Sequence, residues 1–180
     1  MHTTRSISAG LGPAILLACA ATAGITGIAT AQDQVSGTFT VNGTSTALAY
    51  AYAYWKPNFF DETKKDLFVL FSDVALPANA IPKDDDGVSA IAGLVRDGKV
   101  HALELHLDPR SRQLDAAENA AVYHMALSPG RHGMSGMHAF TATTFTTSLL
   151  EGTAHTDGPQ ESDGVKWQYD VRFKVALPPQ

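Results

Sequence analysis

The residues that most clearly suggest a functional site are the histidines and methionines clustered between positions 124 and 138. They are His124, Met125, His132, Met134, Met137 and His138. Thioether sulfur and imidazole nitrogen together suit Cu(I), and imidazole alone suits Cu(II) or zinc. The sequence thus predicts a candidate copper or zinc site. Its ligands would be Met134, Met137 and His138, together with His124 or His132.

Strand geometry limits how much of this cluster converges. On a regular strand successive side chains point to opposite faces, so Met134 and His138 would share a face while Met137 lies on the other. A blue-copper centre is excluded because it needs a cysteine ligand, and the single cysteine, Cys19, lies near the N-terminus. The alternative interpretation is that these methionines and histidines pack in or beside the core.

Other catalytic or metal-binding motifs are absent or incomplete. Residues 84–87, with the sequence DDDG, do not begin an EF-hand loop, because the first and last ligand positions hold proline and glycine; we interpret them as a solvated turn. His101 and His106 are five positions apart and would face opposite sides of a strand, which argues against a shared metal. There is no G-x-S-x-G elbow, H-E-x-x-H motif or P-loop, and acids such as Glu104 form no pair that spacing identifies.

Strands must position these residues, because apolar and polar residues alternate with period two over most of the chain after Gln34. The clearest case is 167–175, where aromatic and aliphatic residues alternate with polar and charged ones. A strand at 35–41 is followed by Asn42-Gly43, the strongest two-residue hairpin sequence. The expected return strand at 46–55 alternates tyrosine with alanine, and its tyrosines fit either a core edge or an exposed surface.

Further strands are predicted at 66–72, 99–108, 134–144 and 146–155, and a short helix at 88–96. The strand at 66–72 is apolar on both faces, as is typical of a central buried strand. Residues 114–127 fit either a helix or a strand. About seven strands at this spacing predict a mainly β fold, either an antiparallel β-sandwich or an open barrel, with one short helix.

The first 31 residues have the three parts of a cleavable signal peptide. Arg5 supplies the positive start, residues 11–23 form the apolar segment, and Ala29-Thr30-Ala31 fits the small-residue cleavage rule. Glycines and a proline interrupt the apolar segment, which argues against a membrane-spanning anchor. Cleavage after Ala31 leaves residues 32–180 as a single β-rich domain.

Cys19 leaves an alternative for the N-terminus. It ends a stretch that loosely matches a lipobox, and on this alternative the protein is a lipoprotein anchored through Cys19.

The chain holds 18 acidic and 13 basic residues, for a net charge of −5. This balance argues against nucleic acid or an anionic membrane surface as a partner. We expect no membrane span in the mature chain.

Several short motifs follow one another in an order that resembles known sequences. They are residues 41–43 (VNG), 66–73 (DLFVLFSD), 96–101 (RDGKVH), 135–140 (SGMHAF) and 167–171 (WQYDV). On these motifs the chain resembles uncharacterised exported bacterial proteins with a single β-rich domain. The resemblance implies no site and no activity. It weakens the metal interpretation, because the stretch around His138 would then belong to the fold.

These observations lead to a ranked expectation about function. We expect a periplasmic or secreted, non-catalytic binding or interaction module whose partner is a protein or a small-molecule ligand. A periplasmic copper- or zinc-binding protein is the alternative, and an enzyme with an unrecognised site is a second alternative.

Overall fold

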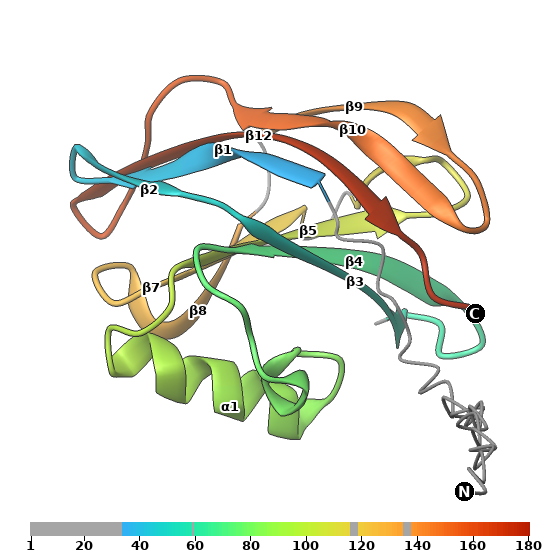
Figure 1. Cartoon of the computed structure of the whole chain (residues 1–180), viewed down its shortest axis with the longest axis horizontal. Helices are drawn as coiled ribbons and strands as arrows, with labels where there is room; N and C mark the ends of the chain where they lie inside the picture. The colour runs from blue at the N-terminus through green and yellow to red at the C-terminus, as the bar shows by residue number, and fades with distance from the viewer. Residues whose placement is uncertain (1–33, 59, 116–118, 135–137) are drawn as a thin grey trace, which may run out of the picture.

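Two antiparallel β-sheets are stacked face to face, and one helix covers the outer side of the second sheet (Figure 1). The computed structural model describes residues 34–58, 60–115, 119–134 and 138–180, and it describes residues 128–134 by their backbone alone. The strands form two open sheets rather than a closed barrel, so the architecture is the sandwich of the two that the sequence allowed. No helix in the described ranges is long and apolar enough to cross a membrane.

The first sheet, sheet A, contains the two ends of the described chain side by side. Its strand order is β2-β1-β12-β10-β9, and β11 pairs with the start of β12. The bounds are β1 Gln34–Val41, β2 Thr44–Ala47, β9 His138–Phe145, β10 Leu149–Thr156, β11 Gln160–Ser162 and β12 Val165–Ala176. Along β12 every second residue is buried, so one face of sheet A meets the core and the other faces solvent.

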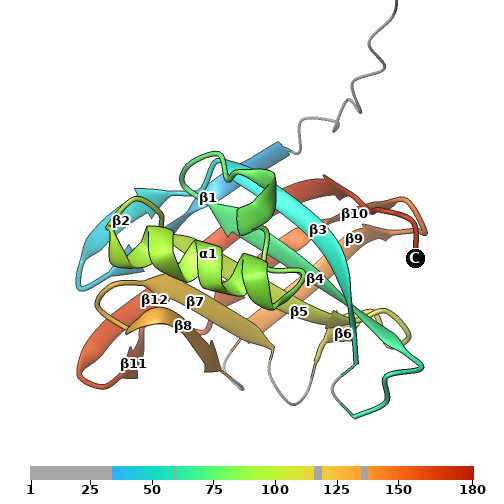
Figure 2. The same ribbon diagram turned by 90° about the horizontal axis from the view of Figure 1, so that it is seen from below.

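The second sheet, sheet B, has the order β3-β4-β5-β7-β8, and β6 pairs with the end of β5. The bounds are β3 Tyr50–Pro57, β4 Lys65–Ser72, β5 Ala102–Asp108, β6 Gln113–Leu114, β7 Ala120–His124 and β8 Ser128–Met134. The helix α1 (Asp85–Arg96) and a short 3-10 turn, η1 (Ala78–Ala80), lie between β4 and β5 in the sequence. Seen from below, α1 lies across the outer face of sheet B (Figure 2).

Sheet B is therefore buried on both faces. On β4, Leu67, Val69 and Phe71 pack into the core between the sheets, whereas Phe68 and Leu70 pack into a second core beneath α1. This confirms the central buried strand that the apolar run predicted. The tyrosines of β3 face the α1 side: Tyr54 is buried, and the Tyr52 hydroxyl accepts a 2.7 Å hydrogen bond from the Leu76 amide.

The hairpin at Asn42-Gly43 is confirmed, but the single return strand at 46–55 is wrong. Both turn residues have positive φ, 49° and 82°, as a two-residue hairpin of this kind requires. The chain then leaves sheet A after β2 and enters sheet B as β3, and the side chain of Leu48 is buried at the crossing. Alternation continues through such a corner, because both sheets cover the same core, so the pattern does not show which sheet a strand joins.

The helix begins earlier than predicted, at Asp85 rather than residue 88. The Asp84 side chain caps it by accepting a 2.8 Å hydrogen bond from the Gly87 amide, and Asp85 and Asp86 lie in its first turn. Acidic residues are favourable there because the helix N-terminus carries partial positive charge. The interpretation of residues 84–87 as a solvated turn is therefore wrong.

Two other stretches differ from expectation or resolve an open choice. Residues 114–127, which fitted a helix or a strand, contain β6 and β7. The single strand expected at 134–144 is instead two strands, because β8 ends at Met134 and β9 begins at His138. These two strands belong to different sheets, so Met134 and His138 lie in different layers of the sandwich.

Replacing two glycines with alanine should have opposite effects on the stability of the fold. A Cβ on Gly37 would lie 2.2 Å from the Asp170 carbonyl oxygen, and its φ is 154°. We expect Gly37→Ala to lower the free energy of unfolding by about 2 kcal/mol or more, because backbone of the paired strand cannot move away cheaply. Gly93 lies inside α1, and the nearest atom to its added Cβ is 4.0 Å away. Gly93→Ala should raise the free energy by about 0.5–1 kcal/mol. Urea unfolding of both variants checks the pair, and equal effects would contradict it.

Candidate functional site

The structure gives different surroundings to the two histidines of the predicted metal cluster whose side chains it describes. His124 ends β7 in sheet B, where its ring centroid lies 4.9 Å from that of His101 and 6.0 Å from that of Phe39. His138 begins β9 in sheet A and stacks beside Trp167 and Tyr169. Met137 and the side chains of His132 and Met134 lie outside the described residues, so the ligand set as predicted stays a prediction.

His138 is already engaged within the fold. Its Nδ1 lies 2.8 Å from the Tyr169 hydroxyl. Burial lowers the pKa of His138, with a smaller opposing effect from Asp157, and burial raises the pKa of Tyr169. Near neutral pH the ring is thus neutral and the phenol protonated, so the Tyr169 hydroxyl donates to Nδ1. A metal at this residue would have to use Nε2.

A second polar group lies where the strands of sheet B end. Ser72 pairs with Ala102, so the residues just beyond them, Asp73 and His101, stand opposite one another. The Asp73 carboxylate accepts the His101 amide at 2.9 Å through one oxygen, and its other oxygen lies 2.7 Å from His101 Nδ1. These two contacts fix the positions of both the backbone and the ring of His101.

His124 completes this group, because its ring faces that of His101. Its Nδ1 accepts a 3.1 Å hydrogen bond from the Ala126 amide. Burial, and then the neighbouring His101, lower the pKa of His124 and favour the neutral ring. We call Asp73, His101 and His124 the histidine pair site. The sequence did not predict this site because His101 was compared only with His106 on its own strand, whereas Asp73 and His124 come from the ends of β4 and β7.

A third polar group is enclosed under the α1 side of sheet B. Glu104 is fully buried, and its carboxylate lies 2.6 Å from His106 Nε2. The hydroxyl of Tyr123 donates to the same carboxylate at 3.1 Å, and the hydroxyl of Tyr54 donates to it as well. Lys56 lies over the neighbouring rings of Tyr54 and Phe68, 5.0 Å from the Phe68 centroid. Such a network satisfies a carboxylate that would otherwise be very unfavourable in an apolar layer.

Glu104 was expected to form no pair that spacing identifies, but the structure pairs it with His106. The two are separated by one residue on β5, so both point to the α1 side of the sheet. The sequence shows this spacing. It also shows the tyrosines of β3, whose hydroxyl groups can bond to a buried acid.

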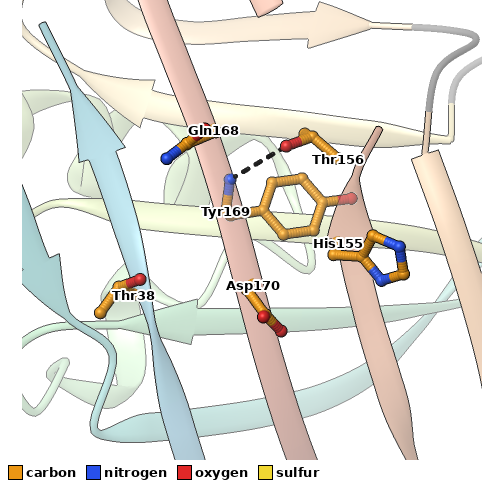
Figure 3. A pocket seen from close by; sticks show the side chains of 6 residues that line it. All are labelled: Thr38, His155, Thr156, Gln168, Tyr169 and Asp170. Carbon is orange, nitrogen blue, oxygen red and sulfur yellow. Dashed lines mark hydrogen bonds between the residues drawn. The ribbon is translucent and has the colours of Figure 1, made fainter. Parts of the chain in front are cut away.

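The solvent face of sheet A carries a shallow polar hollow of about 330 Å³, shown in Figure 3. Its lining residues come from β1, β10 and β12. They are Thr38, His155, Thr156, Gln168, Tyr169 and Asp170. Thr38 and His155 pair with Asp170 from opposite sides, so these three side chains form a row across adjacent strands. Buried Thr156 contacts the Tyr169 amide at 3.4 Å.

No group of three or more His, Cys, Asp or Glu side chains is arranged to hold a metal ion among the residues that the structure describes. The enclosed network around Glu104 suits a structural role, and the hollow and the histidine pair site are open to solvent. Comparisons of this chain with protein-family models, with curated proteins and with solved structures found no match.

The Glu104 network predicts a large and coupled effect on stability. We expect Glu104→Leu to lower the free energy of unfolding by about 3–5 kcal/mol, because it removes the buried carboxylate that accepts from Tyr54 and Tyr123 and contacts His106. Tyr123→Phe alone should lower it by about 1 kcal/mol. In the Glu104→Leu background Tyr123→Phe should cost less, since its bond to the carboxylate is already lost. Urea unfolding of the double-mutant cycle measures this coupling. Exposed Glu161→Gln is the control, and additive effects would contradict the prediction.

Proposed function

We propose that this protein is an exported, non-catalytic binding module that holds a polar ligand on the solvent face of sheet A. The observation that carries the proposal is the contrast between the two outer faces of the sandwich. Sheet B has its outer face covered by α1, whereas no described element covers the outer face of sheet A, which is hollowed at Asp170. A rigid sheet that presents fixed side chains to solvent is a suitable platform for recognition.

The lining of the hollow favours a hydroxyl-rich, uncharged ligand. Thr38 supplies a hydroxyl, Gln168 an amide, Asp170 a carboxylate and His155 an imidazole, so donors and acceptors alternate over a short distance. The carboxylate and the net charge of −5 disfavour anionic ligands. A short neutral oligosaccharide meets these requirements. Because the hollow is shallow, we expect a dissociation constant on the order of 0.1–1 mM.

The ligand is tested by titrating isotope-labelled protein with neutral trisaccharides, namely chitotriose, cellotriose and maltotriose, and following the amide resonances. We expect one of them to shift the resonances of Thr38, His155, Gln168 and Asp170. Asp170→Ala should weaken binding at least about tenfold, because a carboxylate that bonds two hydroxyls is lost. Lys174→Ala, on the same face of β12 but beyond the hollow, should bind normally. Absence of shifts with all three sugars would overturn this ligand class.

Export rests on the first 31 residues, and we propose that they are removed as a signal peptide. Mass spectrometry of protein recovered from the periplasm or the medium should show a chain beginning at Gln32. Ala31→Phe should block cleavage, since the residue before the cut must be small. Cys19→Ala should change neither processing nor location. An intact N-terminus in the cytosol would refute export, and a lipid on Cys19 would establish the lipoprotein alternative.

A further inference from the structure

We propose that His101 and His124 form a two-histidine site for a zinc or copper(II) ion, with Asp73 as the residue that positions His101. This inference goes beyond the proposed function, because the site lies at the strand ends of sheet B and uses none of the residues that line the hollow. Both ions bind the nitrogen of neutral imidazole, and the proposal is for a transition-metal ion with this ligand preference.

The separation of the two rings fits one metal between them. When two imidazoles bind one tetrahedral ion through bonds of about 2.0–2.1 Å, their ring centroids lie roughly 5 Å apart. The centroids of His101 and His124 are 4.9 Å apart, and their planes are inclined by 33°. The centroid separation therefore matches that of two histidines on one ion, and binding requires that one nitrogen of each ring turns toward it.

The hydrogen bonds select which nitrogens are offered. The Nδ1 of His101 is held by Asp73 at 2.7 Å, and the Nδ1 of His124 accepts from the Ala126 amide at 3.1 Å. In the described part of the chain, neither Nε2 has a hydrogen-bond partner. A carboxylate bonded to the far nitrogen of a ligating histidine is the common outer-shell arrangement at metal sites, where it fixes the ring and raises its basicity.

Access and charge also suit a metal ion. The His101 side chain is 29% exposed and that of Asp73 is 16% exposed, so an ion can reach the pair without opening the core. The site supplies one carboxylate charge, that of Asp73 on His101, and metal ions bind imidazole through a deprotonated ring nitrogen. Two protein ligands leave the remaining coordination positions for water or for an external ligand. We therefore expect binding on the order of micromolar, weaker than at a closed four-ligand structural site.

The experiment uses the full protein purified without a histidine tag and loaded with Zn²⁺ or Cu²⁺. Calorimetry gives affinity and stoichiometry, and the imidazole proton resonances report which rings bind. We expect one ion per chain, with shifts on adding Zn²⁺ confined to His101 and His124. His101→Ala and His124→Ala should each weaken binding at least tenfold. Asp73→Asn should weaken it about 10–100-fold while both rings still respond, which separates a positioning role from ligation.

Two matched controls distinguish this site from other histidines. His155→Ala removes an exposed histidine that lines the hollow of sheet A, so it should leave metal affinity unchanged and alter only oligosaccharide binding. A variant carrying Met134→Leu, Met137→Leu and His138→Ala tests the ligand set that the sequence predicted, and it should also keep its affinity. Binding that survives His101→Ala, or that is lost only in the triple variant, would overturn the proposal, as would no binding at all. Should an alanine variant fail to fold, the imidazole resonances of the unaltered protein still decide. Oligosaccharide binding at the hollow is measured separately, so either proposal can fail without the other.

Discussion

The burial of sheet B on both faces is the constraint on which the rest of the structure depends. Its central strands β4 and β5 are covered by sheet A on one side and by α1 on the other. Polar groups on these strands must find partners inside the protein, because water does not reach them. The carboxylate of Glu104 is the extreme case, and tyrosine hydroxyls from β3 and β7 satisfy it together with His106. One polar network thus ties the strands of sheet B together beneath the helix.

The burial of sheet B also limits which surfaces are available for binding. A helix covers one outer face of the sandwich, so both proposed sites use other surfaces, namely the solvent face of sheet A and the ends of strands. The polar hollow at Asp170 lies on that face, and the histidine pair site lies where β4, β5 and β7 begin or end. Strand ends held by a rigid sheet are suitable for placing a few side chains accurately, since the backbone at that point is already fixed. Both proposed sites follow from the layering rather than from a catalytic motif.

Local patterns predicted much of the fold. Alternation along 167–175 identified β12, and the run at 66–72 identified a strand buried on both faces. The Asn42-Gly43 hairpin was identified because few residue pairs tolerate positive φ at both positions. The single strand at 46–55 was wrong, since alternation is the same whether a strand stays in one sheet or crosses to the other. The start of α1 was missed because acidic residues suit a solvated turn as well as a first helical turn.

By itself, the sequence determined the mainly β class, the position of most strands, the single helix and the residue types available for chemistry. Those properties depend on side-chain periodicity and on the conformations each residue allows, which are local. Only the tertiary structure decided the sandwich over the open barrel and which polar groups meet. Asp73 reaches His101 across 28 positions, and Tyr54 reaches Glu104 across 50. Such pairs depend on the strand order β3-β4-β5-β7, and that order is set by how two sheets and a helix share one set of buried surfaces.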